Sequence, residues 1–227
     1  MKTTELLDIA ASNVLHKLRG EATSLLGVNA LGSPRAVGDA VQMYLAGEHG
    51  LKTCLPEIVA GKFESGFSRR SMEDMAFYYG NLYFAVDCKT HNIDTEFNMP
   101  NLISVQRLAN FYRNDTNTFC ILIVEYSVND SQISYRQCHF KPIEALEWNC
   151  LTFGALGWGQ IQIANANRLK FSKTPDRRAW MLELCNRIDR FYCDEIGKIG
   201  ERRRWFDDVR EYWESHTVAE VSGSTQH

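Results

Sequence analysis

The stretch SMEDMAFYYGNLYFAVDCKTHN, residues 71–92, decides the fold of this chain. Two runs rich in aromatic and β-branched residues, MAFYY and LYFAVDCKT, are separated only by Gly80 and Asn81. Two residues of this type between apolar runs are typical of a β-hairpin with a primed turn. The stretch therefore predicts a hairpin whose second strand ends in the charged residues Asp87 and Lys89.

Charges at the end of an apolar strand need an explanation, because burying a charge is costly unless it is paired or bound to a metal. Alternate residues of a strand point to the same face, so Asp87 and Lys89 project together. Asp74, at the start of the partner strand, brings a second carboxylate alongside. The two carboxylates and the main-chain carbonyl of Cys88 are the oxygen ligands that Mg²⁺ prefers.

Such a group has a recognisable chemistry. A lysine beside a Mg²⁺ site can orient or help to deprotonate a water and can stabilise charge that develops on a phosphoryl group. The alternative is a simple ion pair at the strand end, worth at most about 1 kcal/mol. The residues alone leave both interpretations open.

Helical patterns flank the hairpin on both sides. Residues 4–19 have apolar positions at helical spacing and end at Gly20, and Ser33 with Pro34 is typical of the start of a second helix that ends at Gly47. Three further helical patterns are predicted: a helix over 100–113, a long amphipathic helix from Thr174 or Pro175, and its continuation through 201–213.

Strand patterns alternate with these helices. Residues 118–128 form the most continuous apolar run and predict a buried central strand, with 132–140 as its half-exposed neighbour. Residues 141–150 are expected to form a short helix or loop, and the glycine-rich segment that follows becomes strand-like at 160–163. This order predicts the α/β class, with a mixed central β-sheet flanked by helices.

The chain length fits one domain, predicted over residues 1–214. Within it we expect N-terminal helices (1–65) suited to dimerisation or DNA approach, a catalytic core (70–195) and C-terminal helices (175–214). The polar segment 215–227 is predicted to be a disordered tail.

Composition excludes several classes of protein. A net charge of −3 argues against a strongly basic protein that coats nucleic acid, but not against an enzyme with a local basic surface. The seven cysteines include no Cys-x-x-Cys pair, which argues against a disulfide scaffold or structural zinc site. The N-terminus reads as an amphipathic helix rather than a signal peptide, and no apolar run approaches membrane-spanning length. We therefore expect a cytoplasmic protein with no membrane partner.

Separated stretches of the sequence carry a family resemblance. FAVDCKTHNIDTEFNMPNLISVQRLANFY (84–112) resembles the region of the HincII and HpaI group of type II restriction endonucleases in which a strand ending in Asp-Val-Lys is followed by a Pro-Asn-Ile helix start. ALGWGQIQI (155–163) is similar to a second stretch of the same group, and TPDRRAWMLELCNRID (174–189) to its Arg-x-x-Trp helix. The resemblance spans about residues 70–195.

The resemblance implies the restriction endonuclease-like fold of the PD-(D/E)xK superfamily and a Mg²⁺-dependent active site. Asp74 and Asp87 become metal ligands together with the Cys88 carbonyl, and Lys89 becomes the catalytic lysine. Glu73 stands where the family's name has proline. This departure leaves the choice between Glu73 and Asp74 slightly open, although the spacing to Asp87 favours Asp74.

The same resemblance implies a DNA-binding set. Its members, with simpler structural roles as alternatives, are Asn101 (a base contact or a helix start), Gly157 (close backbone approach or a bulge), Trp158 (stacking or packing) and Gln160 with Gln162 (two amides on one strand face near the DNA). Basic residues that could contact phosphates or simply be solvated are Arg69, Arg70, Arg168, Lys170, Lys173, Arg177 and Arg178.

The function implied is that of a homodimeric type II restriction endonuclease. It would cut double-stranded DNA at a short palindrome by in-line attack of water, leaving 5′-phosphate and blunt ends, with a cognate DNA methyltransferase as a possible partner. A two-fold dimer is expected because one site cuts one strand. The apolar face of the N-terminal helix is the candidate interface, with core packing as its alternative. Two other functions stay open: a repair or recombination nuclease of the same superfamily, and a non-catalytic DNA-binding protein.

Overall fold

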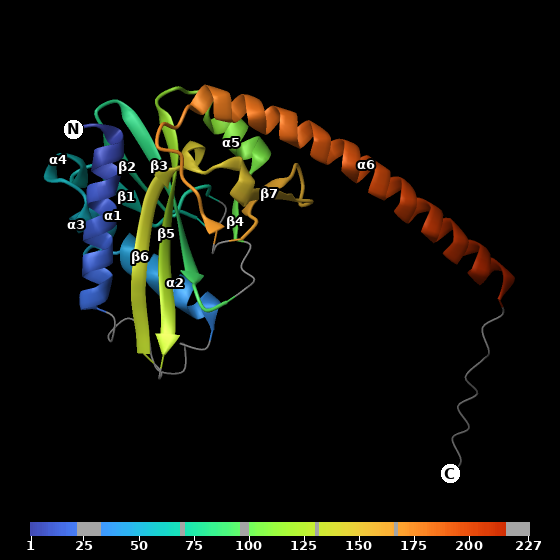
Figure 1. Cartoon of the computed structure of the whole chain (residues 1–227), viewed down its shortest axis with the longest axis horizontal. Helices are drawn as coiled ribbons and strands as arrows, with labels where there is room; N and C mark the ends of the chain where they lie inside the picture. The colour runs from blue at the N-terminus through green and yellow to red at the C-terminus, as the bar shows by residue number, and fades with distance from the viewer. Residues whose placement is uncertain (22–32, 69–70, 96–99, 130–131, 166–167, 217–227) are drawn as a thin grey trace, which may run out of the picture. The chain divides into compact units, whose positions relative to one another are not determined.

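The computed structural model describes residues 1–21, 33–68, 71–95, 100–129, 132–165 and 168–216 (Figure 1). The chain divides into two compact units, Met1–Leu182 and Glu183–His227. The domain bounds expected from the sequence, 1–214, stay a prediction. Of the predicted disordered tail, only Ser215 and His216 lie within the described residues.

A mixed sheet forms the centre of the first unit, as predicted. Its strand order is β1-β2-β3-β5-β6, where β1 is Phe63–Ser65, β2 Met75–Tyr79, β3 Leu82–Asn92, β5 Asn117–Asn129 and β6 Gln132–Pro142. The pair β3 and β5 is parallel and the other pairs are antiparallel. Strand β5 lies between β3 and β6 and is buried over most of its length, which confirms the predicted central strand.

The predicted hairpin is confirmed. Tyr79 pairs with Leu82, which leaves only Gly80 and Asn81 in the turn. Gly80 has a φ of +62°, the left-handed conformation that primed turns require at their first central residue. Phe77 and Phe84 stack across the two strands with ring centroids 4.8 Å apart, which helps to fix their register.

Helices α1 (Thr3–Gly20) and α2 (Pro34–Ala46) pack against β6 and β3 respectively (Figure 1). The Ser33 hydroxyl accepts a hydrogen bond from the N–H of Ala36 at 3.4 Å, and Pro34 is the first helical residue, as predicted. Two short helices, α3 (Leu51–Cys54) and α4 (Glu57–Ala60), follow.

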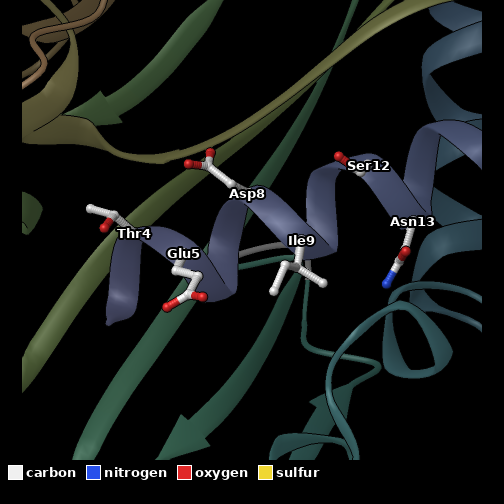
Figure 2. A pocket seen from close by; sticks show the side chains of 6 residues that line it. All are labelled: Thr4, Glu5, Asp8, Ile9, Ser12 and Asn13. Atoms are coloured by element: carbon white, nitrogen blue, oxygen red, sulfur yellow. The ribbon is translucent and has the colours of Figure 1, made fainter. Parts of the chain in front are cut away.

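The apolar face of α1 packs into the core of its own chain. The side chains that point inward are Leu6, Leu7, Ala10, Ala11, Val14 and Leu18. The outer face carries a shallow hollow lined by polar groups and Ile9 (Figure 2). The alternative of core packing therefore accounts for the apolar face, and any dimer contact through α1 would have to use the polar outer face.

A second sheet has the strand order β4-β8-β7, where β4 is Asn101–Ser104, β8 Gln160–Ile163 and β7 Leu151–Gly154. The prediction of a helix over all of 100–113 is wrong in its first turn, since helix α5 covers only Val105–Phe111. Pairing with β8 draws Asn101–Ser104 into a strand and buries Leu102 and Ile103. Two 3₁₀ turns, η2 (Ile143–Ala145) and η3 (Trp148–Cys150), match the short helix or loop expected over 141–150.

Helix α6 runs without interruption over Arg177–Ser215, which confirms the predicted long helix and its continuation. It begins later than Thr174 or Pro175 because the Asp176 carboxylate accepts the N–H of Ala179 at 2.9 Å and so caps the first turn. Trp180 holds this end of the helix in the first unit by donating its indole N–H to the Leu146 carbonyl at 3.0 Å. Within the described parts of the chain, none of the helices combines the length and apolarity needed to cross a bilayer.

Candidate active site

The β2–β3 hairpin brings Asp74 to the charged end of β3. Asp74 directly precedes β2, and its N–H donates to the Val86 carbonyl at 2.9 Å, which extends the ladder by one residue. Its carboxylate oxygen Oδ2 accepts the N–H of Cys88 at 2.7 Å. The prediction that Asp74 lies alongside the Asp87–Lys89 segment is therefore confirmed by direct contact.

Asp87 and Lys89 form an ion pair on one face of β3. The Lys89 ammonium donates to Asp87 Oδ1 at 2.5 Å and lies 3.4 Å from the Cys88 carbonyl oxygen. Asp87 is only 6 % exposed. Its second oxygen, Oδ2, is buried and has no hydrogen-bond partner among the described residues. Both oxygens of a buried carboxylate normally have hydrogen-bond or metal partners. This unpartnered oxygen is therefore a position suited to a ligand.

Burial governs the electrostatics of the pair. Desolvation and, as a smaller effect, the nearby Asp74 carboxylate together raise the pKa of Asp87 to about 7, against the lowering influence of Lys89. For Lys89, burial disfavours the ammonium, but Asp87 and then Asp74 outweigh that effect and raise the pKa of the lysine. Keeping Asp87 ionised at neutral pH therefore costs stability, and a cation beside it would offset that cost.

The donors at this site fit a hard cation rather than a soft one. Among the described residues, no three His, Cys, Asp or Glu side chains lie together in a way that could hold a metal ion. Burial raises the pKa of the Cys88 thiol, which keeps it protonated and unsuited to bind a metal. The remaining donors are the carboxylates of Asp74 and Asp87 and the Cys88 carbonyl. Such an oxygen-only set, completed by water, is typical of Mg²⁺.

A small cavity joins the two carboxylates to the second sheet. It has a volume of about 170 Å³, and its lining includes Asp74, Asp87, Asn101, Arg107 and Gln160. The residues come from the β2–β3 hairpin, β4, α5 and β8, which lie far apart in the sequence. Two motifs that the sequence singled out separately are thus brought together in one place.

Gln160 and Gln162 play different parts, although both lie on β8. Gln160 lines the cavity, and its buried side-chain oxygen Oε1 has no hydrogen-bond partner among the described residues. Gln162 instead donates to Asn101 Oδ1 at 2.5 Å. The Gln162 side chain packs closely over Gly154, where an added Cβ would lie 2.7 Å from Nε2.

Asn101 does not cap a helix. It is an exposed residue of β4 that pairs with Gln162, and helix α5 begins four residues later with Ser104 as its N-cap. The interpretation of Asn101 as a helix start is therefore wrong. Asn101 lines the same cavity as Asp74 and Asp87, and its Oδ1 accepts the Gln162 amide.

Gly157 and Trp158 lie in the loop between β7 and β8 and do not line the cavity. Gly157 has a φ of +58°, a conformation that a side chain would strain, so the turn itself accounts for this glycine. The Trp158 side chain is 62 % exposed. Contacts of either residue with DNA stay a prediction.

Two residues at the site were not predicted from the sequence. Gln42 of α2 donates its amide to Asp74 Oδ1 at 2.6 Å, and Arg107 of α5 lines the cavity. The sequence signal for Gln42 is its position on the less buried face of an amphipathic helix. This signal is weak, because nothing in the sequence of α2 shows that the helix packs beside Asp74. Glu73 accepts the Tyr83 hydroxyl at 3.2 Å, which favours Asp74 over Glu73 as the site carboxylate.

A search with models of known protein families finds no match to this chain, and a search of curated protein sequences also finds none.

Proposed function

We propose that this protein is a Mg²⁺-dependent endonuclease that hydrolyses double-stranded DNA, with the restriction endonuclease-like fold of the PD-(D/E)xK superfamily. One observation carries the proposal: Asp74 and Asp87 line one cavity, Lys89 is paired with Asp87, and the buried Oδ2 of Asp87 has no partner among the described residues. Two carboxylates at one cavity, with a lysine paired to one of them, can supply the metal ligands and the charged donor for phosphodiester hydrolysis.

The reaction is an in-line displacement at phosphorus. A water attacks the phosphorus, the bond to the 3′-oxygen breaks, and the products are a 5′-phosphate and a 3′-hydroxyl, which takes up a proton. Lys89 would orient the water and stabilise the negative charge that develops on the phosphoryl oxygens. Asp74 and Asp87, with the Cys88 carbonyl, would hold Mg²⁺, which when bound lowers the pKa of water and neutralises phosphoryl charge.

The neighbouring polar groups suit DNA recognition. Asn101 and Gln160, which both line the cavity, could contact a base edge or the backbone near the scissile phosphate, since amides pair with adenine in the major groove. Arg107 could neutralise a phosphate. We propose that a homodimer places two such sites for cuts in both strands of a short palindrome, as in type II restriction, with blunt ends and a cognate methyltransferase partner.

The first experiment is incubation of the purified protein with long, sequenced, unmethylated DNA in Mg²⁺ and in EDTA. Discrete fragments that require Mg²⁺ support a sequence-specific endonuclease, and sequencing of their ends gives the site and the type of cut. A smear favours the repair or recombination nuclease. DNA that stays intact with every metal and sequence tried contradicts both and leaves the non-catalytic DNA-binding protein.

Mg²⁺ is expected to stabilise the folded protein in the absence of DNA. The buried charge of Asp87 costs stability, and a bound cation offsets that cost. Mg²⁺ at a free concentration c should therefore add the mass-action term for ligand binding, RT ln(1 + c/Kd), to the free energy of unfolding, and the melting temperature should rise. At one hundred times the dissociation constant this term is about 2.7 kcal/mol. Thermal unfolding with and without Mg²⁺ measures it.

Asp74→Asn removes one ligand charge and is expected to abolish most of that rise. Asp8→Asn is the matched control, because Asp8 is an aspartate of α1 that pairs with Lys141 away from the cavity. An equal Mg²⁺ response in wild type and Asp74→Asn would contradict a metal site at Asp74.

Gln42 is expected to position Asp74. Gln42→Ala removes the 2.6 Å hydrogen bond to Asp74 Oδ1, and we expect about a tenfold loss in the rate of cleavage with little change in melting temperature. A weaker apparent affinity for Mg²⁺ should accompany it, which a purely structural role would not produce. Gln137→Ala on β6 is the control, because Gln137 is exposed and does not line the cavity.

A further inference from the structure

Helix α6 carries a line of exposed apolar side chains in the second unit. The line, called here the α6 stripe, consists of Tyr192, Ile196, Ile199, Phe206 and Trp213, which are between 37 % and 70 % exposed. Their spacing of three, four and seven residues is the heptad spacing of a helix that packs against another helix. The stripe runs for about 30 Å along α6, longer than isolated exposed apolar residues would explain.

Charged residues in the same line decide how such a helix pair can form. Asp189, Arg203 and Arg210 lie at seven-residue intervals from Ile196. In a parallel pair of identical helices, each of these charges would face the same charge on the second copy, which is unfavourable. An antiparallel pair avoids that conflict, because it brings the N-terminal half of one stripe against the C-terminal half of the other.

The charges become complementary when Ile196 faces Ile199 of the second copy. Arg203 then faces the ring of Tyr192, a favourable arrangement for a cation and an aromatic face. Asp189 lies within one helical turn of both Arg203 and Arg210 of the second copy. The apolar residues and the charges of the stripe thus find partners in one register.

The flanking positions agree with this register. The Glu195 carboxylate pairs with Lys198 of its own helix at 2.8 Å, and in this register it also comes beside Arg202 of the second copy. The two-fold axis repeats this contact, so the pair gains two identical interactions between opposite charges. In a parallel pair, Glu195 would instead lie beside Gly200, which offers no charge. The flanks therefore favour the same antiparallel arrangement as the stripe.

We infer that the α6 stripe binds a second copy of this chain, with the two helices antiparallel about a two-fold axis between Ile196 and Ile199. This surface lies outside residues 1–65, where the sequence placed the dimer contact. The inference does not rest on the proposed nuclease activity, because it uses only the residues of α6.

Sedimentation equilibrium of the full chain tests the surface. We expect a particle of twice 26.0 kDa at micromolar concentration, and a dimer dissociation constant at least ~30-fold weaker in Ile196→Glu. Trp205→Glu is the matched control, since Trp205 is 60 % exposed on α6 but points away from the stripe. A monomeric wild type, or an Ile196→Glu variant that dimerises like wild type, overturns the inference. Circular dichroism checks that each variant keeps its helix.

Charge reversal tests the orientation. Glu195→Arg and Arg202→Glu are each expected to weaken the dimer about threefold to tenfold, because each sets like charges beside each other in the antiparallel pair. The double variant should restore the wild-type dissociation constant. A double variant no tighter than the weaker single variant overturns the antiparallel register. Cleavage by Lys89→Ala reports on the catalytic proposal separately, because Lys89 lies on β3.

Discussion

Replacing Lys89 with alanine is expected to reduce Mg²⁺-dependent DNA cleavage by roughly 10³-fold. The Lys89 ammonium is the only charged group that donates directly to Asp87 among the described residues, and it is the group we propose to orient water and stabilise phosphoryl charge. Loss of one such donor or proton-transfer group costs about a hundredfold to ten-thousandfold in rate. Single-turnover cleavage with protein in excess over DNA measures the chemical step directly.

Lys141→Ala is the matched control for this loss. Lys141 is another strand lysine paired with an aspartate, Asp8, but it lies on β6 and not at the cavity. Its removal should leave the cleavage rate within about twofold, since such a partly exposed pair contributes little. DNA affinity should also persist in Lys89→Ala, because the other groups that we propose to contact DNA are intact. A Lys89→Ala protein that still cleaves at the wild-type rate would contradict the assigned role.

The hairpin and its charges could be predicted because their signals are local. Gly80 and Asn81 set the turn, the turn sets the register, and the register fixes which residue of β3 reaches Asp74. The period of two residues then places Asp87 and Lys89 on one face. Each step needs only neighbours in the sequence.

The rest of the site depends on contacts between distant segments. β4 became a strand because β8 pairs with it, and no pattern within residues 101–104 distinguishes that strand from the first turn of a helix. Gln42 reaches Asp74 only because α2 packs on β3, a matter of tertiary packing. Gln160 and Asn101 were singled out by resemblance, whereas their place in the cavity that the two carboxylates line depends on the second sheet.

Arg177 is another residue whose surroundings depend on contacts between distant segments. The sequence offered it as a phosphate contact, but its guanidinium is held inside the first unit. It donates to Glu144 Oε1 at 2.8 Å, to the Asn117 carbonyl at 2.7 Å and to the Thr118 hydroxyl at 2.9 Å. The guanidinium also lies over the ring of Tyr112, whose hydroxyl donates to Glu144 Oε2 at 2.6 Å. This network ties the start of α6 to β5 and η2.

Arg177→Ala is therefore expected to lower the free energy of unfolding of the first unit by about 3–5 kcal/mol. The cost arises because Glu144, 7 % exposed, would be left as a buried carboxylate without its charged partner. Denaturant unfolding followed by Trp fluorescence measures it, since Trp148 and Trp180 stack at 4.4 Å beside the network.

Two further variants separate the ion pair from general damage to α6. Arg178→Ala, at the exposed neighbouring position, should change the free energy of unfolding by at most about 0.5 kcal/mol. Combining Arg177→Ala with Glu144→Gln should cost less than the sum of the two single changes, because no buried charge is left unpaired. Two results would mean that the network contributes little: losses in free energy of unfolding that simply add in the double variant, or a loss below about 1 kcal/mol in Arg177→Ala. Arg177 would then again be a candidate for contact with the DNA backbone.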